Sequence, residues 1–252
     1  LAGLGSRGKD TYAKAAKIHP DKIEIVAIAD VNPKKVEMVA EEYHVPKERC
    51  YTSAEEMFKE EKLADVMFIT TPDRQHVSQA IPAFRKGYHL LLEKPISPDL
   101  DECREIVEVA KECDRKVVVC HVLRYTPVFR KVKEILDSGV IGDIVSINAS
   151  ENVGWFHMAH SFVRGNWRNK ELSSPMILQK CCHDMDLYLW LADKKCKSLS
   201  SFGSTYLFKE ENAPEGCTKR CLDGCKVKAT CPYDAESIYL DSERIGARNG
   251  NT

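Results

Sequence analysis

The chain has 252 residues, enough for one large domain or two of ordinary size. Hydrophobic residues make up 43% of it and charged residues 30%, as is typical of globular proteins with an apolar core. The formal net charge of −1 excludes the strongly basic surface of proteins that bind nucleic acid or anionic membranes, and no apolar run approaches the roughly 18 residues of a membrane span.

The first predicted element is a short strand that leads into a glycine fingerprint, Gly3-Leu4-Gly5-Ser6-Arg7-Gly8. Gly3 permits a tight turn, Gly5 lets the backbone approach a pyrophosphate, and Gly8 lets the following helix pack closely on the strand. The N-terminus of that helix presents free N–H groups to phosphates. We therefore expect this loop, with Ser6 and Arg7, to bind a dinucleotide.

The next predicted strand covers residues 23–29 and ends at Asp30. A carboxylate at this position accepts hydrogen bonds from the adenosine ribose hydroxyls and repels a 2′-phosphate. The sequence therefore predicts NAD as the coenzyme. Arg7 and the pair Lys34-Lys35 leave NADP open as the alternative.

Strand and helix patterns then alternate up to residue 120. Short, nearly all-apolar strands are predicted at 65–70, 88–92 and 116–121. Amphipathic helices are predicted between the strands, with starts near Asn32, Ser53, Val77 and Leu100. This order is typical of a doubly wound parallel sheet, so residues 1–120 are predicted to form an α/β Rossmann domain.

The pattern changes after residue 120. A helix is predicted after Thr126-Pro127, a half-buried strand at 144–149, a helix over 175–192 and a strand around 199–208. Residues 121–252 are therefore predicted to form a second domain of α+β character with a more open sheet.

Glu93-Lys94-Pro95 follows the predicted strand 88–92 directly. Ligands of open parallel sheets bind at the carboxyl ends of the strands. A lysine there can hydrogen-bond a substrate hydroxyl and move its proton, with Glu93 supporting it. The alternative is a solvated Glu–Lys pair at a strand end. His183, in the predicted helix over 175–192, is either an acid/base group or a buried histidine of the core.

Several motifs occur in the order in which one known family carries them. They are the fingerprint at 3–8, Thr71-Pro72 with His76, Glu93-Lys94-Pro95, Arg124-Tyr125, residues 138–143 and His183-Asp184-Met185-Asp186. Together they resemble the glucose–fructose oxidoreductase/inositol dehydrogenase (Gfo/Idh/MocA) family over essentially the whole chain. The resemblance implies a Rossmann domain followed by a domain with a large, open, mostly antiparallel sheet, through which the protein forms a homo-oligomer. It also implies a cis Lys94–Pro95 bond.

The resemblance implies hydride transfer between NAD(P) and a hydroxyl or carbonyl carbon of a sugar, polyol, cyclitol or derivative. Lys94 is then expected to polarise the reacting oxygen and His183 to act as acid/base. Asp186, three residues further on the same helix, is expected to orient the His183 imidazole. The resemblance assigns further residues to the coenzyme, namely Thr71, Pro72, His76, Glu93, Lys94, Arg124, Trp167 and Arg168. We expect Lys94, Tyr125, Gln179, Lys180 and His183 to contact the substrate.

One position departs from the family pattern. Many sugar dehydrogenases of the family carry an aspartate four residues before the histidine, where this chain has Gln179. Glutamine cannot take up a proton, which argues against a carboxylate–imidazole relay. Lys180, beside it, adds a cation, and two lysines with a histidine suit an anionic sugar. The loop of residues 151–174 is rich in aromatic and basic side chains, which either stack on a sugar or pack as a hinge between domains.

A cysteine-rich segment occupies residues of about 212–234 and is an insertion relative to the family plan. Its four cysteines are Cys217, Cys221, Cys225 and Cys231. Thiolates favour zinc or an iron–sulfur cluster, but the spacing matches neither a CxxC pair nor a ferredoxin. We therefore predict no metal, and keep this cluster as the candidate site beside free thiols or oxidised pairs. Two rival functions follow from it: a catalytically rewired cofactor- or redox-sensing protein, and a structural metal-binding module.

The eleven cysteines are scattered and odd in number, which argues against the disulfide framework of a secreted protein. No secretion signal begins the sequence, so a cytoplasmic protein is predicted. The chain starts without Met inside its first strand and closes with Arg248–Thr252, without a visible terminal element. We expect it to be truncated at both ends.

Overall fold

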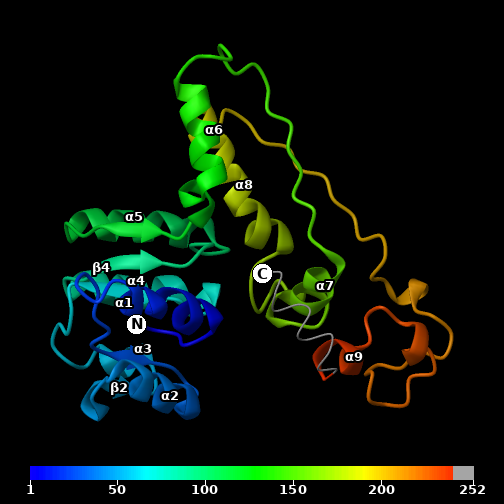
Figure 1. Cartoon of the computed structure of the whole chain (residues 1–252), viewed down its shortest axis with the longest axis horizontal. Helices are drawn as coiled ribbons and strands as arrows, with labels where there is room; N and C mark the ends of the chain where they lie inside the picture. Colours follow the sequence, from blue (N-terminus) through cyan, green and yellow to red (C-terminus); the bar gives the residue numbers. More distant parts are fainter. Residues whose placement is uncertain (241–252) are drawn as a thin grey trace. The chain divides into compact units, whose positions relative to one another are not determined.

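The computed structural model describes residues 1–240; the closing segment Arg248–Thr252 lies outside the described residues. The chain divides into two compact units. The first comprises residues 1–151 and 169–195, and the second comprises residues 152–168 and the segment that begins at Cys196 (Figure 1). The predicted domain division after residue 120 stays a prediction.

The first unit contains a parallel sheet. Its strands within the described residues are β1 (Ile28–Ala29), β2 (Cys50–Tyr51), β3 (Val66–Ile69), β4 (His89–Leu92) and β5 (Val117–Val119). β1 pairs with β2, and β4 lies between β3 and β5. Ala2 forms parallel bridges to both Ala29 and Ile69, so the first residues of the chain join the two halves of the sheet. This spatial order is that of a doubly wound Rossmann sheet, and the predicted α/β class is confirmed.

Helices connect the strands of the first unit. Their bounds are the π-helix η1 (Ser6–Ala13), α1 (Lys14–Ile18), α2 (Pro33–Tyr43), α3 (Ala54–Met57), α4 (His76–Arg85), α5 (Leu100–Glu112), α6 (Pro127–Asp137) and α8 (Met176–Ala192). Short 3₁₀ turns are η2 (Lys47–Arg49), η3 (Asp73–Gln75) and η4 (Val122–Tyr125). The predicted cap of α2 is confirmed, because the Asn32 side chain accepts a hydrogen bond from the Lys34 N–H at 3.0 Å. Figure 1 shows α6 and α8 side by side.

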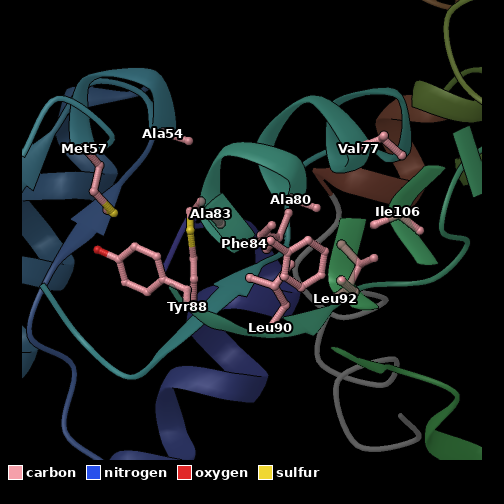
Figure 2. Close-up of a cluster of buried hydrophobic side chains, with 14 of the residues drawn as sticks. Ala54, Met57, Val77, Ala80, Ala83, Phe84, Tyr88, Leu90, Leu92 and Ile106 are labelled. Carbon is pink, nitrogen blue, oxygen red and sulfur yellow. The ribbon is translucent and has the colours of Figure 1, made fainter. Parts of the chain in front are cut away.

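Both faces of the sheet are covered. Alternate residues of β3 belong to different clusters: Met67 and Ile69 pack with α4 and α5, whereas Phe68 packs against the cluster that contains Val39 of α2. Figure 2 shows Phe84 of α4 among the apolar side chains of the first cluster. A fully buried side chain of this size contributes about 1.5–3 kcal/mol relative to an exposed one. The packing holds the carboxyl ends of the strands at one fixed edge.

Two segments expected to be strands are extended without being strands. Among the described residues, none after β5 is assigned to a strand, including 144–149 and 199–208. Their side chains are largely exposed, as at Val145 and Phe202 (96% and 97% exposed). The alternation of apolar and polar residues predicts which face of a strand is apolar, but a strand also needs a hydrogen-bonded neighbour. The described part of the second domain supplies none.

The second unit consists of short helices and turns. They are α7 (Trp155–His157), the π-helix η5 (Met158–Val163), η6 (Asn166–Arg168), η7 (Glu210–Asn212), η8 (Lys228–Thr230) and α9 (Ala235–Tyr239). Aromatic contacts hold them together: the Tyr233 ring lies 5.1 Å from Phe208 and 6.0 Å from Trp155, centroid to centroid. Arg164 donates a hydrogen bond to the Tyr233 carbonyl. These contacts lie within the second unit, so the choice between stacking on a sugar and forming a hinge between domains stays open for the aromatic loop.

Candidate active site

The glycine fingerprint lies where the first residues of the chain leave the sheet. Gly3 has φ +89°, and a Cβ added to it would lie 2.8 Å from the Thr70 carbonyl. A Cβ on Gly8 would lie 2.0 Å from the Gly3 oxygen, whereas one on Gly5 would meet nothing within 4 Å. Gly3 and Gly8 are therefore required by packing. The open space in front of Gly5 fits the predicted approach of a pyrophosphate.

Asp30 is held at the same loop by backbone N–H groups. Its Oδ2 accepts a hydrogen bond from Leu4 N at 2.6 Å, and its Oδ1 accepts one from Asn32 N at 2.8 Å. Each carboxylate oxygen keeps a further lone pair, so the group can still accept ribose hydroxyls. Arg7 is largely exposed in this loop, with Nε 3.9 Å from Glu93 Oε1. This arrangement fits an NAD-type dinucleotide.

Glu93 is buried and organises the turn that follows β4. Its Oε1 accepts a hydrogen bond from the Tyr12 hydroxyl at 2.6 Å, and its Oε2 accepts one from the Lys94 backbone N–H at 2.9 Å. Burial, together with hydrogen bonds to Cys120 and Glu93, raises the pKa of Tyr12, so its hydroxyl stays protonated. Glu93 thus supports Lys94 through the backbone.

His76 fixes the same turn from α4. The Lys94–Pro95 bond is cis, as the resemblance implied. His76 is 1% exposed, with Nδ1 2.9 Å from the Pro95 carbonyl oxygen and Nε2 2.9 Å from the Thr71 carbonyl oxygen. The ring therefore joins the turn after β4 to the turn after β3, and lies behind the site rather than on its surface.

The Lys94 ammonium reaches helix α8. Its Nζ donates to the Gln179 carbonyl oxygen at 2.9 Å and to Gln179 Oε1 at 3.4 Å. Gln179 and His183 are four residues apart in α8, so they share one face of the helix. The structure therefore brings the two predicted catalytic residues to one place at the carboxyl edge of the sheet.

His183 is half-buried in this cationic environment. Burial is the main reason that its pKa falls to about 4, and the neighbouring Lys94 ammonium and His121 lower it further. Its buried Nδ1 has no hydrogen-bond partner within residues 1–240. The imidazole is consequently neutral near pH 7 and able to accept a proton.

Asp186 does not orient His183, which corrects the expectation from the sequence. Its two oxygens accept a bidentate pair of hydrogen bonds from Arg124 Nε and Nη2, both at 2.6 Å. The Nδ1 of His121 lies 3.2 Å from Asp186 Oδ1, and the His121 ring meets His183 edge-on at 5.9 Å. The planar guanidinium fork matches a carboxylate better than one imidazole N–H does. The Arg124 guanidinium also lies over the Trp190 ring, and its expected contact with the coenzyme stays a prediction.

Three residues of this site were missed from the sequence. His121 follows β5, Asp73 follows β3, and Ser174 immediately precedes the turn into α8. Asp73 and Ser174 are both buried beside Gln179. The position of His121 and Asp73 at the carboxyl ends of strands is the signal that points to them, because ligands of parallel sheets bind at that edge.

Two family profiles match the chain. The one described as "Oxidoreductase family, NAD-binding Rossmann fold" matches residues 1–121, and the one described as "GFO/IDH/MocA C-terminal domain" matches residues 129–221. The chain belongs to the GFO/IDH/MocA family. The resemblance predicted from the motifs is confirmed. Residues 1–121, which contain the glycine fingerprint, form an NAD-binding Rossmann fold.

Individual GFO/IDH/MocA proteins are similar at moderate identity. YteT of Bacillus subtilis (strain 168) is 25% identical over 242 residues, which cover 92% of this chain and 56% of YteT. Inositol 2-dehydrogenase of Corynebacterium glutamicum (strain R) is 24% identical over 79% of this chain and 55% of that protein. The solved WlbA dehydrogenase of Bordetella pertussis, in complex with NADH and UDP-GlcNAcA, is 25% identical with a TM-score of 0.63, over 75% of this chain and 56% of WlbA. The chain spans about half the length of the curated relatives it matches.

The remaining residues predicted for the site of this GFO/IDH/MocA chain are divided between the two units. The first unit contains Ser6, Thr71, Pro72, Tyr125 and Lys180. Thr71 donates from its hydroxyl to Gln79 Oε1 at 2.8 Å, Ser6 opens η1 and Pro72 precedes η3, all beside the fingerprint strand or β3. Lys180 is half-buried, and burial followed by the charge of Lys94 lowers its pKa. Tyr125 is 63% exposed at the end of η4.

Trp167 and Arg168 belong to the second unit. The Trp167 ring lies 6.4 Å from Phe162, and Arg168 Nη1 donates to the Gly165 carbonyl at 3.0 Å. Their expected place beside the nicotinamide stays a prediction.

The cysteine-rich segment does not form a metal site in the described structure. Within residues 1–240, no group of three or more His, Cys, Asp or Glu side chains is placed to hold a metal ion. The four cysteines of the segment carry free thiols. Hydrogen bonds from the Thr218 and Val227 backbones lower the pKa of the Cys225 thiol, which favours its thiolate form.

A groove lies at the opposite edge of the sheet. It has a volume of about 580 Å³ and is lined mainly by residues 22–27 and 63–68, which lead into β1 and β3. These are the amino ends of the strands, away from Lys94 and His183. The groove is therefore separate from the candidate active site.

Proposed function

We propose that this protein is an NAD-dependent dehydrogenase that oxidises a hydroxyl-bearing carbon of a sugar, cyclitol or derivative, or reduces the corresponding carbonyl. The observation that carries the proposal is that α8 presents His183 one helical turn beyond Gln179, which holds the Lys94 ammonium. Oxidation of a hydroxyl requires a donor that stabilises charge on the oxygen and a base that accepts its proton. The Lys94 ammonium and the neutral His183 imidazole can supply these two functions.

The coenzyme would be held by the fingerprint loop, with the pyrophosphate at Gly5 and the N-terminus of η1 and the ribose at Asp30. Bound NAD supplies the acceptor for the hydride that leaves the substrate carbon. The fixed carboxylate of Asp30 disfavours a 2′-phosphate, so we propose a preference for NAD over NADP.

The residues of the chain manage the proton and the charge on oxygen. Lys94 donates a hydrogen bond to the substrate oxygen and stabilises the negative charge that develops there. His183 accepts the hydroxyl proton through a ring nitrogen, which its lowered pKa keeps unprotonated near neutral pH. In the reductive direction His183 returns that proton to the alkoxide.

The names of relatives support the substrate class. Corynebacterium glutamicum inositol 2-dehydrogenase is named for a cyclitol, and Bordetella pertussis WlbA was solved with the sugar nucleotide UDP-GlcNAcA. Lys180 lies close enough to Lys94 for the Lys94 charge to add to burial in lowering its pKa. Two neighbouring lysines favour a substrate with an anionic group. A sensing protein with rewired chemistry is less well supported, because it needs neither Lys94 nor His183 in place.

A substrate screen tests the proposal. The full chain is incubated with NAD or NADP and a panel of polyols, cyclitols, aldoses and uronic acids, and absorbance of the reduced nicotinamide is followed. We expect turnover with NAD on at least one of them, and a loss of about 10²–10⁴-fold in kcat for Lys94→Met or His183→Asn. Lys111→Met, an exposed lysine on α5, is the matched control and keeps full activity. Turnover that survives in both site variants would contradict the proposal.

Two wider expectations are kept as proposals. We propose self-association through the second domain because the family resemblance implies it. We propose a cytoplasmic location because the scattered, odd-numbered cysteines do not fit a secreted disulfide framework. None of the helices in the described part of the chain is long and apolar enough to cross a bilayer.

A further inference from the structure

A buried polar cluster lies directly behind the Lys94 ammonium. Its members Asp73, Ser174 and Gln179 are only 4%, 0% and 5% exposed. Gln179 Nε2 donates to Asp73 Oδ2 and to Ser174 Oγ, both at 2.8 Å, and the Ser174 hydroxyl also donates to Asp73 Oδ2. Buried polar side chains persist where their hydrogen bonds are made, so this cluster has one defined arrangement.

The cluster fixes which way the Gln179 amide points. A carboxylate only accepts hydrogen bonds, and an ammonium only donates them. The NH₂ of Gln179 therefore has to face Asp73, and Oε1 has to face Lys94, as the 2.8 Å and 3.4 Å contacts show. If the amide were flipped, its oxygen would face the Asp73 carboxylate, which is also an acceptor. Its NH₂ would face the Lys94 ammonium, which is also a donor. The Asp73 carboxylate and the Lys94 ammonium therefore both favour the same orientation of the Gln179 amide.

We propose that Asp73 is a positioning residue for Lys94, acting through the amide of Gln179. The inference rests on the proposed function of Lys94. The carboxylate that many family dehydrogenases carry four residues before the histidine is here replaced by a neutral amide, and a carboxylate lies one hydrogen bond further from the ammonium, at position 73. Asp73 polarises the amide, and the amide oxygen at 3.4 Å acts together with the Gln179 backbone carbonyl at 2.9 Å to hold the ammonium where the substrate oxygen is to bind.

The same geometry predicts that a carboxylate at position 179 is incompatible with Asp73. Glutamate is nearly isosteric with glutamine, so Gln179→Glu would place a second carboxylate oxygen against Asp73 Oδ2 in a buried site. Two like charges at this distance cannot both stay ionised without a large cost. An exchange of the two groups, Asp73→Asn with Gln179→Glu, restores one amide and one carboxylate in contact.

The first experiment measures the Lys94 amine without any substrate. Wild type, Asp73→Asn and the control Asp101→Asn are treated with trace acetic anhydride at fixed pH, and acetylation of each lysine is followed by peptide mass spectrometry. In Asp73→Asn the amide is free to flip, so we expect Lys94 to react about 3-fold faster while other lysines are unchanged. Asp101 is 88% exposed and pairs with Arg104 on the surface of α5, so its variant should leave Lys94 unchanged.

The second experiment measures turnover on a substrate found by the screen. Asp73→Asn should lower kcat about 10-fold with KM changed less than about 3-fold, because it disturbs the orientation of the ammonium rather than substrate binding. Gln179→Glu should lower kcat about 100-fold, and the double variant should recover to within about 10-fold of wild type. The midpoint of thermal unfolding should fall in Gln179→Glu and recover in the double variant.

The outcomes separate this inference from the proposed function. Unchanged Lys94 acetylation in Asp73→Asn, or a double variant no better than Gln179→Glu in both unfolding midpoint and kcat, overturns the role of Asp73. If no substrate is turned over by the wild type but acetylation and unfolding respond as expected, the coupling stands as geometry and the proposed dehydrogenase function fails.

Discussion

At the scale of single residues, the lowered pKa of His183 leaves its imidazole neutral, as the proposed role of proton acceptor requires. Burial and the Lys94 ammonium disfavour a second positive charge, so the imidazole stays neutral well below pH 7. The same burial creates a pH-dependent contribution to stability. An unfolded chain exposes this ring to water, where its pKa returns towards 6.5.

We therefore expect acid to destabilise the fold through His183. Between pH 6.5 and about 4 the unfolded chain binds a proton at this ring and the folded chain does not, so the contribution is fully present above pH 6.5 and is lost as pH falls through this window. Urea unfolding at pH 7 and pH 5 should show a larger loss of unfolding free energy in wild type than in His183→Asn. His19→Asn, at an exposed position after α1, is the matched control. An equal loss in wild type and His183→Asn would contradict the expectation.

Residue identity predicted part of this site and not the rest. Lys94 and His183 were predicted from their family motifs, because position at a strand end and on a helix left a solvated Glu–Lys pair and a core histidine as alternatives. The partner of Asp186 was not, because spacing along α8 gives the face but not the side chain that meets it from η4. Arg124 and Asp186 are 62 residues apart in the sequence, and a long-range pair of this kind leaves no periodic signal.

At the scale of elements, different glycines of the fingerprint serve packing and coenzyme binding. Gly8 faces the Gly3 oxygen at a distance that no Cβ can occupy, whereas Gly5 faces open space at the start of η1. The predicted helix after the fingerprint is present, but it begins as a π-helix over Ser6–Ala13 before α1. The apolar pattern predicts a helix there and does not distinguish its hydrogen-bonding period.

Two alanine variants should therefore differ in kind. Gly8→Ala forces the helix away from the strand and should lower the free energy of unfolding by about 1–3 kcal/mol. Gly5→Ala has φ −70° and no steric conflict, so the free energy of unfolding should change by less than about 0.5 kcal/mol. Its methyl group would instead occupy the space predicted for the pyrophosphate, and NADH affinity should fall at least about 10-fold. Urea unfolding and NADH fluorescence titration measure the two effects, and equal NADH affinity in Gly5→Ala and wild type would refute the assignment.

At the scale of the whole molecule, the first unit followed from the sequence more completely than the second. Apolar strands buried on both faces and capped helices are local patterns, and they predicted β3 to β5 and α2 to α6 closely. The exception in the first unit is the segment 144–149, which alternates as a strand should but has no partner strand in the described structure, because a sheet is a property of several strands together. The cysteine-rich segment has neither a helical nor a strand period, so its turns were not predictable from periodicity.

Removal of metal should leave the molecule unchanged. The cysteines of the 212–234 segment are not gathered around one point in the described structure. Protein purified without chelator should therefore hold no stoichiometric zinc or iron, and EDTA should not shift the thermal unfolding midpoint. Structural zinc contributes about 10–16 kcal/mol where it is present, so the contrary result would be unmistakable. Elemental analysis together with unfolding in EDTA checks this expectation.

The discontinuity of the first unit has a consequence for biosynthesis. The contact between Asp73 and Gln179 spans 106 residues, and α8 returns to the sheet only after residues 152–168 have left it. A nascent chain that has emerged as far as β5 can fold its coenzyme loop, but it has no group to hold the Lys94 ammonium. The proposed coenzyme loop is thus complete in a shorter nascent chain than the proposed proton-transfer site, which also needs α8.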